Sequence, residues 1–188
     1  MADRAESTVF LQADEYIAEH ARSALAHIDP LTLQRVLELL ARSPKIFVYG
    51  AGRSGIIGRA LAMRLVQAGL SAYVIGESVT PIVQKGDLVL IFSNRGESYS
   101  SIQTANIVRR EGAELIVITS RPSSKLAHAA TVLIGLKFPE DPEQPRLAPL
   151  GTIFEAASLR FGDALIADWM RVRGETEDSM RRRHAIMV

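Results

Sequence analysis

The 188-residue sequence contains no cysteine and no long hydrophobic run. The absence of cysteine excludes disulfides, thiolate zinc sites, iron–sulfur clusters and a cysteine nucleophile. No apolar run approaches the roughly 18 residues of a membrane span, and residues 1–10 lack the basic-then-apolar order of a signal peptide. We therefore expect no membrane interaction and a cytoplasmic location.

The sequence also lacks an excess of charge of either sign. Lys and Arg together number 22 and Asp and Glu number 21, which gives a formal net charge of +1. A general nucleic-acid binder usually carries a strong basic excess, so no nucleic-acid partner is predicted. With 47% hydrophobic and 23% charged residues, the composition is that of an ordinary globular protein, and one domain over 1–188 is expected.

Short runs rich in Val, Ile and Leu recur along the middle of the chain. Their nearly continuous hydrophobicity is typical of strands buried on both faces. The runs are Lys45–Tyr49, Ala72–Ile75, Asp87–Phe92, Glu114–Thr119 and Thr131–Leu136. Helical spacing of apolar residues separates several of them, as in Ile56–Gln67 and Ser100–Glu111. This alternation predicts a parallel sheet over residues 44–137 with helices on both faces.

The flanking segments are predicted to be mostly helical. Residues 1–43 contain a long helix with an apolar stripe from Phe10 to Ile28, and a second helix that begins at Pro30. The first helix is long for a domain of this size and is a candidate subunit contact. Residues 138–150 contain four prolines and are predicted to be an exposed connection without helix. Residues 151–188 comprise a last long helix, Thr152–Arg171, and a tail.

A glycine-rich turn follows the first predicted strand directly. Residues 50–55 read Gly-Ala-Gly-Arg-Ser-Gly and lead into a helix, as in turns that bring backbone amides close to a phosphate. The same spacing matches the dinucleotide fingerprint, in which Glu77 would bind a ribose hydroxyl. A nicotinamide- or flavin-binding site is therefore an open alternative. No GKS or GKT follows, so a nucleoside-triphosphate loop is not predicted.

A serine-containing loop follows the strand at Asp87–Phe92, where residues 93–98 read Ser-Asn-Arg-Gly-Glu-Ser. The carboxyl ends of parallel strands that meet at a switch point share one crevice. Ser54, Ser93 and Ser98, with the adjoining helix amides, would then hold one phosphate monoester, and a dinucleotide site does not need this second loop. Each serine taken alone is equally well explained as a turn or N-cap residue.

Further motifs occur in a fixed order along the chain. After the turn at 48–55 come residues 76–81 (GESVTP), the serine loop, residues 118–124 (ITSRPSS), residues 147–155 (LAPLGTIFE) and residues 183–185 (RHA). This ordered set resembles the 6-phospho-3-hexuloisomerase family of the sugar-isomerase (SIS) domain superfamily. The resemblance implies a flavodoxin-like three-layer α/β/α sandwich with a five-stranded parallel sheet, and a homotetramer. It also implies interconversion of a 3-hexulose 6-phosphate and fructose 6-phosphate without a metal or organic cofactor.

The serine loop departs from the family pattern Ser-Gly-Ser-Gly-Glu-Thr, because Asn94 and Arg95 replace the middle Gly and Ser. One hydroxyl contact to phosphate is lost. A guanidinium can bind phosphate in a bidentate, charge-assisted way, but Arg95 can equally point to solvent or obstruct the pocket. The predicted substrate-binding residues are Gly52, Arg53, Ser54, Gly55, Ser93, Asn94, Arg95 and Ser98.

Isomerisation of a sugar phosphate requires a base and a group that moves protons between oxygens. Glu155, at the start of the last long helix, is the predicted base. Thr152 and Glu155 also form a capping-box pattern, which would satisfy helix amides without chemistry; the resemblance favours the base. His184 is the predicted proton shuttle, since imidazole titrates near neutral pH, although a solvated tail is the alternative.

The other histidines and carboxylates are weaker candidates. No HxH, HExxH or clustered carboxylate spacing occurs, so no metal site is predicted. Glu97 is either a second acid or base or a residue that complements a helix N-terminus. The sequence thus predicts a phosphosugar isomerase. The alternatives are a non-catalytic SIS module that senses a sugar phosphate and an NAD-dependent oxidoreductase.

Overall fold

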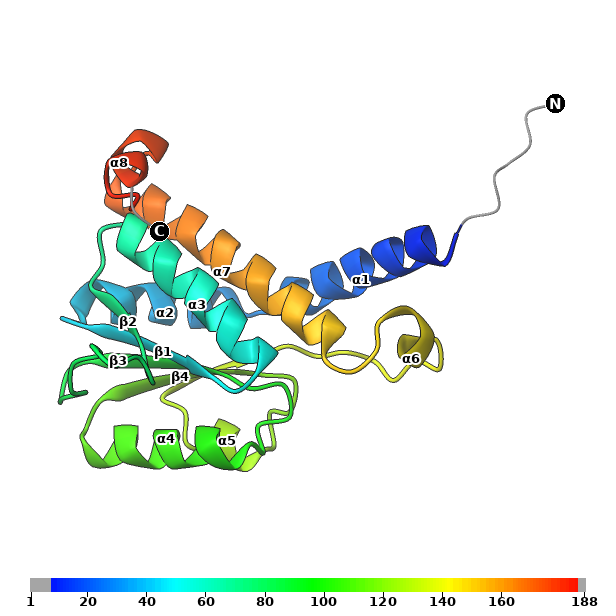
Figure 1. Cartoon of the computed structure of the whole chain (residues 1–188), viewed down its shortest axis with the longest axis horizontal. Helices are drawn as coiled ribbons and strands as arrows, with labels where there is room; N and C mark the ends of the chain where they lie inside the picture. The colour runs from blue at the N-terminus through cyan, green and yellow to red at the C-terminus, as the bar shows by residue number, and fades with distance from the viewer. Residues whose placement is uncertain (1–7, 186–188) are drawn as a thin grey trace.

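Five parallel strands form one sheet in the order β2-β1-β3-β4-β5. The computed structural model describes residues 8–185, and Figure 1 shows the sheet in the middle of the molecule. The strands are β1 Ile46–Gly50, β2 Ala72–Val74, β3 Leu88–Phe92, β4 Glu114–Thr119 and β5 Val132–Gly135. Because β2 and β3 lie on opposite sides of β1, the carboxyl ends of β1 and β3 form the switch point of the sheet.

Helices cover both faces of the sheet (Figure 1). The main helices are α1 Val9–Ala26, α2 Pro30–Arg42, α3 Arg53–Gln67, α4 Tyr99–Arg110, α5 Lys125–His128 and α7 Thr152–Arg173. α2, α3 and α7 pack on one face, and α4 and α5 pack on the other. Side chains alternate accordingly: Ile46 and Val48 of β1 face the first layer and Phe47 faces the second. The predicted three-layer sandwich with a five-stranded parallel sheet is confirmed.

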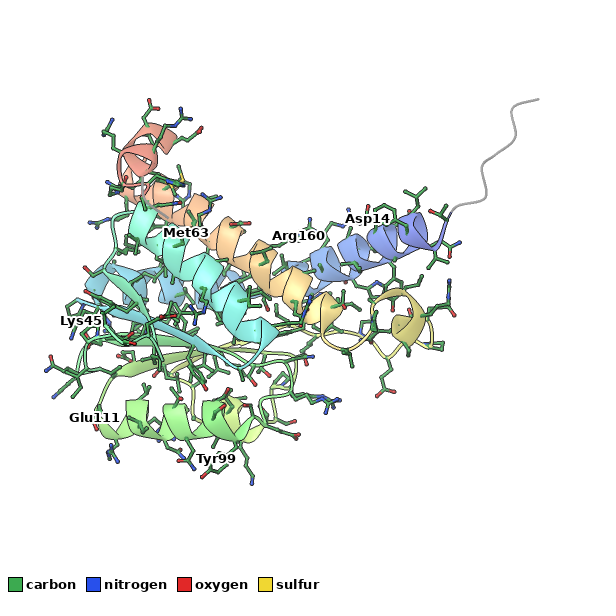
Figure 2. All side chains as sticks on the ribbon, in the orientation of Figure 1. Asp14, Lys45, Met63, Tyr99, Glu111 and Arg160 are labelled. Carbon is green, nitrogen blue, oxygen red and sulfur yellow. The ribbon has the colours of Figure 1, made fainter. Side chains whose placement is uncertain are left out.

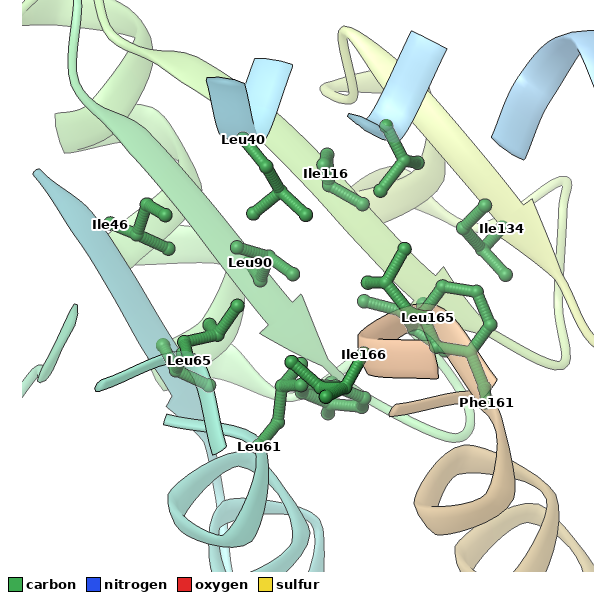
Figure 3. Close-up of a cluster of buried hydrophobic side chains, with 14 of the residues drawn as sticks. Leu40, Ile46, Leu61, Leu65, Leu90, Ile116, Ile134, Phe161, Leu165 and Ile166 are labelled. Carbon is green, nitrogen blue, oxygen red and sulfur yellow. The ribbon is translucent and has the colours of Figure 1, made fainter. Parts of the chain in front are cut away.

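The larger hydrophobic core lies between the sheet and the layer formed by α2, α3 and α7 (Figure 3). The helices contribute Leu40, Leu61, Leu65, Phe161, Leu165 and Ile166, and the strands contribute Ile46, Leu90, Ile116 and Ile134. Burying each such side chain stabilises the fold by about 1.5–3 kcal/mol. This core fixes the starts of α3 and α7 relative to the ends of β1 and β3.

The first half of α1 is not covered by the rest of the chain. Ala21 and Ala24 are buried where α1 packs near α7, whereas its first turns extend away from the sheet (Figure 1). Phe10 is 76% exposed, so only the later part of the predicted stripe is in the core. Figure 2 labels Met63 on α3, where its side chain is also exposed. Figure 2 marks the opposite face by Tyr99, at the start of α4.

Two short helices occur where none was predicted. α6, Gln144–Leu147, is a single turn inside the proline-rich connection. Pro145 is tolerated there because it stands in the first turn, where its missing N–H would have no helical partner. α8, Glu177–Arg182, begins with a capping box between Thr176 and Ser179. The prediction of a connection without helix over 138–150 is therefore wrong at this turn.

Candidate active site

The glycine-rich turn brings the start of α3 against the end of β1. A Cβ atom on Gly55 would lie only 2.4 Å from the carbonyl oxygen of Gly50, so a larger residue there would force the strand and helix apart. Gly52 is the N-cap of α3 and has a φ of 57°, a conformation that favours glycine. The turn thereby places Ser54 in the first turn of α3 at the switch point. The hydroxyl of Ser54 has no hydrogen-bond partner within residues 8–185.

The serine loop connects β3 to α4 at the neighbouring strand end. Ser93 is buried, and its hydroxyl has no partner in the part of the chain that the structure describes. Ser98 is the N-cap of α4 by position, but its hydroxyl makes no bond to the helix amides and lies 3.1 Å from the hydroxyl of Ser100. The hydroxyls of Ser93 and Ser98 are therefore not used for capping. Both remain available to a ligand, as the phosphate interpretation requires.

Glu155 lies in the first turn of α7, close to the same edge of the sheet. The predicted capping box does not form, because Gly151 is the N-cap and the Thr152 hydroxyl donates to the carbonyl oxygen of Pro149 at 2.6 Å. The Glu155 carboxylate instead accepts from Arg53, with Nε at 2.6 Å and the terminal nitrogen at 2.5 Å. The Glu155 side chain is 14% exposed. A partly buried carboxylate with no capping role is what a general base at this position needs.

Arg53 is held by this carboxylate. The hydrogen bond that Arg53 donates to Glu155, and then the negative charge of Glu155, raise the pKa of the Arg53 guanidinium. The structure shows the Arg53 side chain bound to Glu155, and its contact with the substrate stays a prediction. Leu150, just before α7, has a φ of 58°, and it is the one residue other than glycine within 8–185 with a positive φ. Such backbone strain is often found next to functional sites.

Asn94 links the serine loop to the loop after β4. Its side-chain oxygen accepts from the Ser120 hydroxyl at 2.7 Å, and its carbonyl oxygen accepts from the hydroxyls of Thr119 and Ser120 at 2.9 Å each. The Asn94 side chain also approaches the start of α7. A Cβ atom built on Gly151 would lie 3.4 Å from Asn94 Nδ2 and 3.1 Å from Glu155 Oε1. Asn94 therefore stands between Glu155 and the β4 loop.

Two cavities of about 330 Å³ each flank the start of α7. One is an apolar groove between α3 and α7, lined by Arg53, Ile56, Ile57, Thr152, Glu155, Ala156 and Leu159. The other is polar, and its lining includes Asn94, Arg95, Ser120 and Arg121. The sequence predicts roles for residues after β1 and β3 and for Glu155 and His184, but none for the β4 loop. The signal was present in residues 118–124, whose serines and arginine follow a buried strand.

His184 lies at the opposite end of α3 from Glu155. It lines a cavity with Arg64 and Gln67 of the last turn of α3, about 20 Å along the helix from Arg53 at 1.5 Å per residue. Arg183 fixes this segment, because its Nε donates to the carbonyl oxygen of Gln67 at 2.7 Å. Within one chain the structure brings Glu155 together with the glycine turn and the serine loop, and it does not bring His184 to them.

Glu77 and Glu97 are the remaining candidate residues. Glu77, the predicted ribose ligand of the dinucleotide alternative, forms an ion pair with Arg59 of α3. Glu97 is exposed. Within residues 8–185, no three His, Asp or Glu side chains are grouped as in a metal site. No described helix combines the length and the hydropathy that crossing a membrane requires.

Comparison with known proteins identifies the family. The SIS domain model matches residues 39–159, which is more than half of the chain. The chain belongs to the SIS domain family. The 3-hexulose-6-phosphate isomerase of Bacillus subtilis is 32% identical over 184 residues, which cover 93% of this chain and 98% of that protein. The enzyme of the same name from Methylomonas aminofaciens is 35% identical over 153 residues, 80% of this chain and 84% of that protein.

A solved structure agrees with these relatives. A hypothetical protein from Methanococcus jannaschii, whose structure was used to infer a 3-hexulose-6-phosphate isomerase function, superposes with a TM-score of 0.86. It is 27% identical and covers 95% of this chain and 100% of its own. The resemblance to this group of SIS proteins is confirmed. The SIS match contains the glycine turn, the serine loop and Glu155, whereas His184 lies outside it.

Proposed function

We propose that this SIS protein is a phosphosugar isomerase that interconverts D-arabino-hex-3-ulose 6-phosphate and D-fructose 6-phosphate. The observation that carries the proposal is the position of Glu155. Its partly buried carboxylate faces the switch point, is oriented by Arg53 and makes no capping bond, while unpaired serine hydroxyls lie in the two adjacent loops. The named relatives support the same substrate class.

In the proposed reaction, Glu155 removes the proton from C2 of the 3-hexulose and forms a cis-enediol. It returns a proton to C3, while a second group moves the proton of the C2 hydroxyl to the oxygen on C3. The carbonyl thus moves from C3 to C2, and no oxidant or cofactor is consumed. Ser54, Ser93, Ser98 and the adjoining amides hold the phosphate, which places the reacting carbons at Glu155.

We assign the second group to His184 of another copy of the chain. Within one chain His184 lies at the far end of α3, so a shared site requires an oligomer, and we propose the homotetramer that the family resemblance implies. Imidazole titrates near neutral pH and can both donate and accept a proton, as a shuttle must. Residues 1–7 and 186–188 lie outside the described structure, and the proposal does not depend on them.

The decisive experiment incubates the purified protein with fructose 6-phosphate in D2O and follows the sugar by NMR. We expect the 3-hexulose to form and deuterium to appear at C3 of fructose 6-phosphate, because the proton that the base removes from C3 exchanges with solvent before it is returned to the enediol. Absence of both would refute the isomerase for this substrate.

Thermal stabilisation distinguishes the alternatives, since a ligand that binds only the native state stabilises it by about 2.7 kcal/mol at 100 times its Kd. Stabilisation by fructose 6-phosphate without exchange would indicate a non-catalytic sensor. Stabilisation by NAD alone would indicate an oxidoreductase.

A further inference from the structure

Four arginines at the carboxyl edge of the sheet differ in whether they have partners. Arg53 is bound by Glu155, and Arg59 is bound by Glu77. Arg95 and Arg121 are exposed, and neither guanidinium has an ion pair or side-chain hydrogen bond within residues 8–185. Arg95 and Arg121 are therefore the guanidiniums at this edge that are free to bind an anion.

Arg95 and Arg121 line the same polar cavity of about 330 Å³. Asn94 and Ser120 form part of its wall and are joined by the 2.7 Å hydrogen bond between their side chains. This bond holds the serine loop and the β4 loop together, which fixes the separation of the backbones that carry the two arginines. Glu140 is the one carboxylate in the lining, so the charged side chains of the cavity have a net positive charge.

We propose that Arg121, together with Arg95, binds the phosphate group of the substrate and is a specificity-determining residue. This inference rests on the proposed function. Three or four carbon atoms separate the phosphate of a 6-phosphorylated hexulose from the carbons that react. Asn94 borders the cavity on one side and stands next to Gly151 and Glu155 on the other. A phosphate between the two arginines would therefore leave the sugar extending past Asn94 toward Glu155.

The two guanidiniums account for the altered serine loop. Arg95 stands where the family pattern has a hydroxyl, and a guanidinium donates two parallel charge-assisted hydrogen bonds to phosphate. Arg121 approaches from a different strand end, so a phosphate in this cavity has guanidinium donors on two sides. This arrangement favours a dianionic phosphate ester over the neutral sugar.

The test compares Arg121→Gln and Arg121→Lys with a control, Arg109→Gln. Arg109 is also exposed, but it lies in the last turn of α4, at the end away from the serine loop. Calorimetry measures the Kd of fructose 6-phosphate and of inorganic phosphate, and the NMR assay gives kcat and KM. We expect Arg121→Gln to raise both Kd values by about 10- to 100-fold and to change KM more than kcat. Arg121→Lys should bind phosphate more tightly than Arg121→Gln but more weakly than the wild type, because lysine keeps the positive charge but cannot donate two parallel hydrogen bonds.

The outcomes separate this inference from the proposed function. If the wild-type protein isomerises the sugar and folded Arg121→Gln binds both phosphates within twofold of it, the role of Arg121 is overturned and the function stands. If the wild-type protein shows no isomerisation but Arg121→Gln weakens phosphate binding, the anion site stands and the function falls. If the wild-type protein binds neither phosphate, or if Arg109→Gln weakens binding equally, the inference is wrong.

Discussion

At the scale of single residues, the ion pair between Arg53 and Glu155 connects the glycine turn to the start of α7. The two residues lie 102 positions apart in the chain, and the hydrogen bond between Arg53 Nε and Glu155 Oε2 joins the elements that carry them. Arg53 is 74% exposed, so the ion pair contributes little to the free energy of unfolding. The ion pair instead joins the start of α3 to the start of α7.

Replacing Glu155 by Gln tests whether the carboxylate performs chemistry. We expect kcat to fall by about 10²- to 10⁴-fold, because the amide cannot accept the carbon-bound proton. The melting temperature should change by no more than about 2 °C, since the side chain does not cap α7. NMR exchange and circular dichroism measure the two effects.

Glu77→Gln provides the matched control for this variant. Glu77 is also a glutamate paired with an arginine of α3, but the proposed reaction gives it no proton to carry. It should retain wild-type kcat. Full turnover by Glu155→Gln, or an equal loss in both variants, would exclude Glu155 as the base.

At the scale of elements, the serine loop depends on a glycine that accommodates the β4 loop. Gly96 has a φ of 65°, and a Cβ there would lie 2.0 Å from Ser124 Oγ and 2.6 Å from Ser124 Cβ. Gly174, after α7, has nearly the same φ, 67°, but nothing lies within 4 Å of its Cβ position. Substituting the two glycines therefore separates two contributions to the free energy of unfolding. One is the strain of the left-handed backbone, and the other is the clash of a Cβ with Ser124.

We expect Gly174→Ala to reduce the free energy of unfolding by about 1 kcal/mol, which is the cost of the left-handed conformation alone. Gly96→Ala should reduce it by about 3 kcal/mol or more, because Ser124 or the loop must move. Chemical denaturation measures both. Equal destabilisation of the two variants would show that the approach of Ser124 to Gly96 is not tight in solution.

The strands and main helices could be predicted because the pattern of apolar residues within each segment indicates which of its faces are buried. The run Glu114–Thr119 has the same bounds in the prediction and the structure, since a strand covered on both faces consists of consecutive apolar residues. The start of α3 was predicted three residues late, at Ile56 instead of Arg53, because Arg53 and Ser54 carry no apolar signal. α6 was missed because four residues with a proline give no helical period.

The site could be predicted only in part, because its contacts join residues distant in sequence. The loops after β1 and β3 were predicted to meet because strand order in a parallel sheet follows general rules. The partner of Glu155 is Arg53, 102 positions away, and no local pattern connects the two residues. The contact of Asn94 with Ser120 likewise required the register of β3 against β4.

At the scale of the whole molecule, the distribution of exposed apolar residues accords with the proposed oligomer. Val9, Phe10 and Leu11 are exposed on the part of α1 that extends from the body, and Ile56 and Met63 are exposed on α3. Large exposed apolar groups that gather on particular elements often mark contacts between subunits. A second copy that covers α3 near Arg53 could also deliver its His184 to Glu155.

A mixing experiment tests whether the site is shared between subunits. Chains carrying Glu155→Gln and chains carrying His184→Ala are each expected to be inactive in isomerisation. If Glu155 and His184 come from different subunits, co-expression in equal amounts leaves about a quarter of the sites with both wild-type residues, because the chains assort at random around the symmetric assembly. The recovered kcat per site should then approach a quarter of the wild-type value, measured by NMR after sizing the oligomer. Recovery requires a site made by two chains, since every individual chain in the mixture lacks one of the two residues. No recovery in a correctly sized mixed oligomer would show that His184 does not act across the interface, and full activity of His184→Ala alone would remove it from the mechanism.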